Sequence, residues 1–201
     1  MTAASRLEIF VEEPSAGAAL RALVPKIRPD LDFDVHEFQG CHDLLSKLPA
    51  RFRAYASWLP EDARLIVLIA RDRNDCRALK QKILDMAREA KLRTTTRGSQ
   101  PRQVLVRIAI EELESWFFGD TEALRSAFPR LPKTLDKRAS FRDPDAIPNV
   151  WEQLEKVLQD AGYFRTGLPK IKCAREVAAH MDPAANRSRS FQVFRDGLRA
   201  L

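Results

Sequence analysis

One apolar run constrains the fold of this chain more than any other feature of the sequence. Residues 65–70 read Leu-Ile-Val-Leu-Ile-Ala, with no polar side chain among them. A strand that is apolar on both faces is typical of a parallel sheet that helices cover on both sides. The pattern predicts strands at 7–11, 33–38, 64–70 and 103–110, and helices between them at 16–27, 42–58 and 74–92. This alternation indicates an α/β domain whose mainly parallel sheet has four or more strands.

Two details of these helices can be predicted from local chemistry. Ser15 is a natural N-cap for the helix at 16–27, and Pro14 before it cannot lie in the interior of that helix. Pro49 lies within the helical pattern at 42–58 and should kink or divide it.

The pattern changes after Asp120. Four prolines, at positions 129, 132, 144 and 148, interrupt an irregular stretch. Helical patterns follow at 150–161, 171–180 and 191–201. We therefore predict an α/β domain at 1–120 and a helical C-terminal subdomain at 121–201 that packs on it.

The location that the sequence favours is the cytoplasm. No apolar run reaches the roughly 18 residues that a membrane span needs. The first residues, Met-Thr-Ala-Ala-Ser-Arg, contain no hydrophobic core of a signal peptide. The three cysteines form no CxxC pair, so neither a disulfide nor a zinc site is expected, and a reducing compartment is the default.

The charge of the chain is basic and unevenly distributed. The sequence has 34 Lys and Arg against 28 Asp and Glu, a net charge of +6. Residues 121–201 account for most of this excess, with 15 basic and 10 acidic side chains. A basic surface attracts phosphate groups, although an ordinary solvated surface explains the charge equally well.

Acidic side chains follow three of the four predicted strands. They are Glu12, Glu13, Asp72, Asp75, Glu111, Glu112 and Glu114. The carboxyl ends of parallel strands meet at one edge of the sheet, so these carboxylates should lie close together. Crowded carboxylates repel one another, and Mg²⁺ or Mn²⁺ removes that conflict because such ions prefer oxygen ligands. Ion pairs with Arg71, Arg73 or Arg107 would explain any single acid, but for the whole set we favour a metal site.

The sequence also resembles a known family. The stretches FVEEPSAGAAL, ARDRNDC, RIAIEELESWFFGD, FRDPDAIPN and NRSRSFQVF resemble the bacterial family DUF4276, whose members are similar to Toprim domains. The resemblance covers nearly the whole chain. Toprim domains occur in topoisomerases, primases, recombination proteins and OLD-type nucleases. The resemblance implies a Toprim-like fold, a glutamate that acts as general acid and base, and a D-x-D pair that binds Mg²⁺.

The resemblance assigns roles to single residues. Glu12 takes the place of the Toprim glutamate, and Asp72 that of the first aspartate of the pair. The second aspartate falls on Asn74, which offers an oxygen without a charge, so Asp75 would act in its place or the metal would bind weakly. Glu13 stands where Toprim domains usually have glycine, which adds a ligand or shifts the alignment by one residue.

The same resemblance extends to the segment after the fourth strand. By position, Glu111, Glu112 and Glu114 would supply ligands for a second metal ion, as in OLD-like nucleases.

Four arginines are candidates for contact with nucleic acid. Arg71 and Arg73 alternate with acids and would balance their charge or touch a phosphate, although outward solvation is at least as good an explanation. Arg187 and Arg189 lie beside Ser188 and Ser190, a composition suited to phosphate. Ser190 is also a candidate N-cap for the last helix.

The three aromatic residues at 116–118, Trp-Phe-Phe, also have two explanations. They would stack on bases, or they would form a wedge of core between the sheet and the subdomain. We favour the core.

Two classes of function remain open. The first is a Mg²⁺-dependent nuclease, or another phosphoryl-transfer enzyme that acts on nucleic acid. The second is a non-catalytic partner that binds nucleic acid or protein. OLD-type nucleases work with an ATPase, and this chain has no P-loop motif. The resemblance therefore implies a separately encoded ATPase partner and a role in defence against phage, while self-association is left open.

Overall fold

The computed structural model describes residues 4–71, 75–98 and 100–201. Its centre is a four-stranded sheet in the order β2-β1-β3-β4, and every neighbouring pair of strands is parallel. The strands are β1 (Arg6–Val11), β2 (Asp32–Glu37), β3 (Ala63–Ala70) and β4 (Val104–Ala109). The predicted mainly parallel α/β sheet is confirmed, and β3 is the run of buried apolar residues that indicated it.

Eight α-helices and three short 3₁₀ turns are described around the sheet. The helices are α1 (Pro14–Ile27), α2 (Cys41–Ala56), α3 (Cys76–Glu89), α4 (Glu114–Gly119), α5 (Thr121–Ala127), α6 (Val150–Asp160), α7 (Lys170–His180) and α8 (Arg189–Arg199). The 3₁₀ turns are η1 (Leu135–Lys137), η2 (Ala139–Phe141) and η3 (Pro144–Ala146), within the proline-interrupted stretch.

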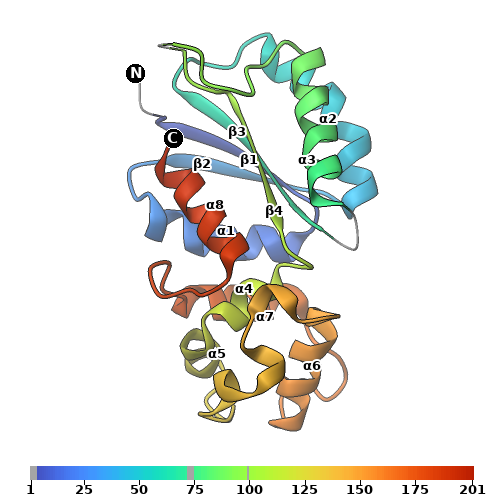
Figure 1. Cartoon of the computed structure of the whole chain (residues 1–201), viewed down its shortest axis with the longest axis vertical. Helices are drawn as coiled ribbons and strands as arrows, with labels where there is room; N and C mark the ends of the chain where they lie inside the picture. The colour runs from blue at the N-terminus through green and yellow to red at the C-terminus, as the bar shows by residue number, and fades with distance from the viewer. Residues whose placement is uncertain (1–3, 72–74, 99) are drawn as a thin grey trace.

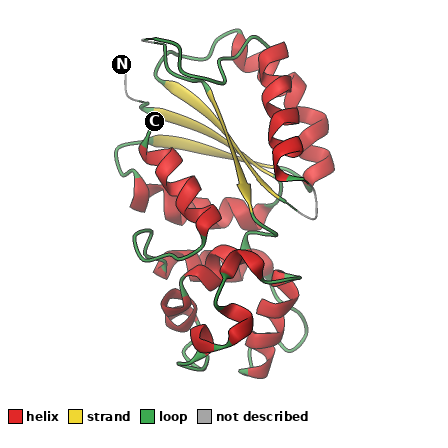
Figure 2. Ribbon diagram, viewed as in Figure 1, coloured by secondary structure: helices red, strands yellow, loops and turns green. Residues whose placement is uncertain are grey.

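Helices cover both faces of the sheet (Figure 2). Alternate residues of a strand point to opposite faces, so Leu7, Ile9 and Val11 of β1 join the core beneath α1, while Phe10 joins the core beneath α2 and α3. The last helix, α8, returns to the sheet and packs against β4. The end of α8 lies beside the start of β1, since the Ala4 amide donates a hydrogen bond to the Leu201 carbonyl.

The remaining helices, α4 to α7, form a lobe beyond the carboxyl ends of the strands (Figure 1). The predicted division into domains at 1–120 and 121–201 stays a prediction, since α8 packs on β4 and α4, which precedes residue 121, already belongs to the lobe. The lobe is joined to the α/β part by contacts of α7 with α1. The aromatic side chains of Trp116, Phe117 and Phe118 are buried between the two parts, so they belong to the core rather than to an exposed stacking surface. No helix in the described ranges is long and apolar enough to span a membrane.

Three local predictions need correction. Helix α1 begins at Pro14 and has Glu13 as its N-cap, because proline fits the first helical turn, where its missing N–H would have no partner in the helix. Pro49 does not divide α2, which is continuous from Cys41 to Ala56. The N-cap of α8 is Ser188 rather than Ser190, and its Oγ accepts a hydrogen bond from the Phe191 amide at 3.1 Å.

Candidate functional site

The carboxyl ends of β1, β3 and β4 face the helical lobe (Figure 1), and described glutamates follow β1 and β4 there. Glu12 comes directly after β1, and its Oε1 accepts a hydrogen bond from the Ala70 amide at 2.8 Å. Ala70 is the last residue of β3. The Glu12 carboxylate therefore reaches across to the neighbouring strand end, as expected for a residue at a parallel edge.

An ion pair lies between the ends of β3 and β4. Arg71 donates its backbone N–H to the Ala109 carbonyl, and its guanidinium forms an ion pair with Glu111. Glu111 adopts a left-handed backbone conformation, with φ of 56°, which turns the chain away from the sheet. Arg71 thus balances at least one of the acids, which is the alternative that the sequence had left open for this arginine.

Two further glutamates point into the junction between sheet and lobe. The Oε2 of Glu112 accepts a hydrogen bond from the Trp151 amide at 3.1 Å, at the start of α6. Burial raises the pKa of Glu112, and the charge of Lys170 opposes that rise. Glu114, at the start of α4, is only 3% exposed, and its Oε2 has no hydrogen-bond partner among the described residues.

The environment of Glu114 favours its neutral form. The pKa of Glu114 is raised to about 7, mainly by burial and also by the charges of Glu13 and Glu112, against the opposing charge of Lys170. A buried carboxyl oxygen without a partner costs free energy whenever the group is ionised. Glu13, Glu112 and Glu114 are therefore close enough to repel one another, as the sequence predicts for acids at coincident strand ends.

Two residues of α7 belong to this junction, and the sequence did not reveal either of them. Lys170 is the first residue of α7, and its ammonium lies 4.3 Å from the centroid of the Trp151 ring while its charge acts on Glu112 and Glu114. Cys173 is buried one turn later, and burial together with the Glu114 charge raises its pKa to about 12. No local pattern marks these positions, because only packing of α7 brings them to the strand ends.

The other predicted site residues have varied positions. Asp75 is the N-cap of α3, and its Oδ1 accepts hydrogen bonds from the Arg77 and Ala78 amides, each at 2.8 Å. These two hydrogen bonds hold the pKa of Asp75 below its usual value, and the bond from the Ala78 amide has the larger effect. The predicted ligands Asp72 and Asn74, and the predicted nucleic-acid contact Arg73, lie outside the described residues.

The two arginines of the C-terminal segment differ in their surroundings. Arg187 donates long hydrogen bonds of 3.4 Å to the carbonyls of Arg142 and Phe118, in the helical lobe. Arg189 is exposed at the start of α8 and lies close to the outer edge of β4. Both guanidiniums are accessible, and their contact with nucleic acid stays a prediction.

The comparison with protein families is specific. The family model described as a domain of unknown function, DUF4276, matches residues 11–199. The chain belongs to the DUF4276 family. No curated protein sequence matches it.

Solved structures similar to this DUF4276 chain are C-terminal regions of OLD proteins. That of Xanthomonas campestris pv. campestris has 18% identity and a TM-score of 0.46, over 98% of this chain and 97% of that one. That of Burkholderia pseudomallei has 20% identity and a TM-score of 0.46, over 96% of this chain and 98% of that one. Identities and scores of this size describe a distant likeness and assign no residue a role.

The acids of the DUF4276 chain suit a hard divalent cation in their chemistry. All are oxygen donors, and the unpartnered Oε2 of Glu114 is of the kind that a cation would satisfy. Within 4–71, 75–98 and 100–201, however, no three His, Cys, Asp or Glu side chains are grouped closely enough to hold a metal ion. Asp72 and Asn74, which lie outside these ranges, stay predicted ligands.

Proposed function

We propose that this DUF4276 protein is a divalent-metal-dependent nuclease, or a related phosphoryl-transfer enzyme, whose site is the acidic edge of the sheet. The observation that supports this most is the buried and unpartnered carboxyl oxygen of Glu114 beside Glu13 and Glu112. Such crowding is unfavourable in the absence of a counter-charge, and groups with strongly shifted pKa values cluster at functional sites. Mg²⁺ or Mn²⁺ is the cofactor that carboxylate ligands favour.

The proposed roles of the residues follow from their positions. Glu114, Glu112 and Glu13, together with Asp72 and Asn74, would hold the ion between the strand ends and the helical lobe. When bound, the cation supplies Lewis-acid stabilisation of negative charge on the phosphate.

Two other side chains would act on the substrate. Glu12, which the Ala70 amide orients across the end of β3, would take a proton from the attacking water and return one to the leaving oxygen. Lys170 would offer a positive charge to the phosphate from the opposite side of the junction.

The wider role proposed here comes from the family resemblance. OLD-type nucleases work with an ATPase, so we propose a separately encoded ATPase as partner and phage defence as the setting, with nucleic acid as substrate. The net charge of +6 and the exposed arginines of the C-terminal segment are compatible with that substrate.

A second candidate is a non-catalytic partner that binds nucleic acid or protein. Two of the predicted ligands already have structural roles: Glu111 forms an ion pair with Arg71, and Asp75 is the N-cap of α3. The neutral Asn74 at the second position of the D-x-D pair points the same way. This candidate predicts nucleic-acid binding that needs no metal and is followed by no cleavage.

A cleavage assay decides between the two. Labelled DNA and RNA, single- and double-stranded, are incubated with the protein, and with any ATPase encoded beside it, while Mg²⁺ or Mn²⁺ is titrated. The nuclease proposal expects metal-dependent cleavage by the wild type, its loss in Glu12→Gln, and normal cleavage in Glu89→Gln, an exposed carboxylate at the end of α3. Cleavage that persists in excess EDTA, or that is equal in Glu12→Gln and wild type, would refute it.

A further inference from the structure

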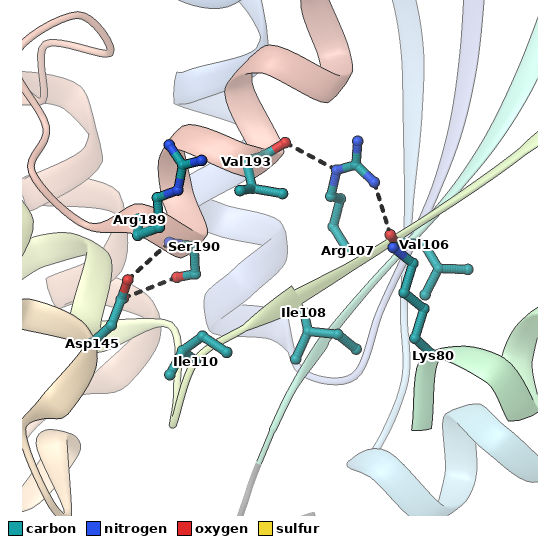
Figure 3. A pocket seen from close by; sticks show the side chains of 9 residues that line it. All are labelled: Lys80, Val106, Arg107, Ile108, Ile110, Asp145, Arg189, Ser190 and Val193. Carbon is teal, nitrogen blue, oxygen red and sulfur yellow. Dashed lines mark hydrogen bonds between the residues drawn. The ribbon is translucent and has the colours of Figure 1, made fainter. Parts of the chain in front are cut away.

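A pocket lies across the outer edge of β4 (Figure 3). β4 is the last strand of the sheet, so one side of its backbone has no neighbouring strand. Helix α3 borders the pocket on one face of the sheet and α8 on the other, and η3 closes one end. Its volume of about 410 Å³ is within the range of ligand-binding pockets, roughly 300–1,000 Å³.

Three cations line this pocket, and the acids around it do not neutralise them. Lys80, Arg107 and Arg189 take part in no ion pair among the described residues. The acidic side chain of the lining is Asp145, and its carboxylate accepts hydrogen bonds from the Ser188 and Ser190 hydroxyls and from the Ser190 amide, at 2.8, 3.0 and 2.9 Å. Asp145 is therefore committed to the start of α8, and the pocket keeps an excess of positive charge.

The fold holds Arg107 in place without an acidic partner. Its Nε donates to the Val193 carbonyl at 3.0 Å and its Nη1 to the Val106 carbonyl at 3.1 Å (Figure 3). The guanidinium lies against Gly197 of α8, where a methyl group would come within 2.6 Å of Nε and 2.7 Å of Cζ. Glycine at this position thus leaves the space that the guanidinium occupies.

The positive charges of the pocket are unfavourable where they lie. Burial lowers the pKa of Lys80, and the neighbouring charges of Arg107 and Arg102 lower it further. Burial likewise lowers the pKa of Arg107, and Arg102 adds to the effect. An anion in the pocket would relieve this repulsion.

The rest of the lining is aliphatic. Val106, Ile108 and Ile110 of β4 and its extension form the floor, and Val193 of α8 faces them with 41% of its surface exposed. An exposed aliphatic side chain beside a group of cations favours a ligand that has both an anionic and an apolar part. A nucleoside phosphate has both, since a phosphate is attached to a sugar and a base with apolar faces.

We propose that this pocket binds one nucleotide, with Lys80, Arg107 and Arg189 around its phosphate and the aliphatic floor against its sugar or base. The nucleotide is either free or one unit of a nucleic-acid strand. The strand is favoured by position, because Ile110 lines the pocket and Glu111 at the acidic edge is the next residue. This last step, that a bound strand continues to the acidic edge, rests on the proposed function, whereas binding of the phosphate does not.

The test measures binding without any metal, in EDTA. An oligothymidylate of about twelve nucleotides is the fluorescent probe, and salt is varied from roughly 50 to 300 mM. The Lys80→Gln/Arg107→Gln variant should bind about tenfold more weakly or worse. Its plot of log affinity against log salt should be less steep by about 1.4, which is roughly 0.7 for each lost phosphate contact on a single strand.

Two further variants guard against general effects. Lys82→Gln removes an exposed lysine two residues from Lys80 that does not line the pocket, and it should bind as the wild type does. Gly197→Ala keeps every charge but places a methyl group where the Arg107 guanidinium lies, and it should weaken binding severalfold. Circular dichroism and thermal unfolding show whether each variant is folded. If the Lys80→Gln/Arg107→Gln variant is not folded, the single variants Lys80→Gln and Gly197→Ala carry the test.

Thymidine monophosphate as a competitor identifies the source of the nucleotide. Competition with the wild type that is lost in the double variant indicates a free nucleotide, and weakened oligonucleotide binding without such competition indicates a strand. Wild-type affinity and salt dependence in the double variant would overturn the proposal. Absence of cleavage with metal, beside variant-dependent binding, would instead overturn only the proposed nuclease.

Discussion

Replacement of Glu114 by glutamine should remove a specific pH dependence from the stability of the protein. The folded-state pKa of about 7 is above the ordinary value of 4.5, so the folded state binds more protons than the unfolded state between these values. The stability contributed by this group is therefore fully present below about pH 4.5 and is lost as the pH rises through about 7. Glutamine has the shape of glutamate but does not ionise.

The magnitude follows from the difference between the two pKa values. That difference is about 2.5, and at 1.36 kcal/mol for each unit it corresponds to about 3 kcal/mol. The free energy of unfolding of the wild type, minus that of Glu114→Gln, should thus fall by up to about 3 kcal/mol between pH 4.5 and pH 8. Any cost of placing an amide at this buried position is the same at both pH values and cancels in the comparison.

Urea denaturation across this pH range, with EDTA present, measures the effect. The control is Glu89→Gln, whose exposed side chain should change stability by the same small amount at every pH. A difference between wild type and Glu114→Gln that does not vary with pH would refute the reasoning, because the carboxyl would then be hydrated. Addition of Mn²⁺ at pH 8 should stabilise the wild type more than Glu114→Gln if this carboxylate holds the metal.

Three other outcomes are expected. Asp72→Asn should abolish metal-dependent cleavage yet leave nucleic-acid binding intact in a filter-binding assay, because it removes charge from the proposed metal site and not from the basic surface. Equal cleavage by wild type and variant would mean that the acids have a structural role. The double variant Arg187→Ala/Arg189→Ala should bind all nucleic-acid sequences more weakly to a similar extent, and its slope of log affinity against log salt should be less steep by up to about two. An unchanged slope would assign these arginines to folding or to contact with a protein partner. Asp145→Ala should lower the free energy of unfolding by about 2–3 kcal/mol, because it removes the acceptor at the start of α8. Asp160→Ala, at an exposed position, should cost little, and chemical denaturation compares the two variants.

Local sequence patterns determined the architecture of this protein. The apolar run in β3 marks a strand buried on both faces, and the alternation of short strands with amphipathic helices leaves a parallel sheet as the natural arrangement. Because parallel strands end at one edge, the acids after β1 and β4 were expected to meet there, and Glu13 does act electrostatically on Glu112 and Glu114. These conclusions depend only on periodicity and strand direction, which are local properties.

The tertiary structure alone decided which of these acids are buried, paired or left without a partner. Arg71 pairs with Glu111, and Lys170 reaches Glu112 and Glu114 from a helix more than fifty residues away in the chain. Glu111 and Glu114 both follow β4 closely in the sequence. Only the structure shows that Glu111 is in an ion pair and that Glu114 is buried, because burial depends on how the helical lobe packs on the sheet. The same holds for the pocket beside β4, where α8 returns from the end of the chain to place Arg107 against Gly197. Contacts between distant segments leave no period or motif in the sequence, so only the folded chain shows them.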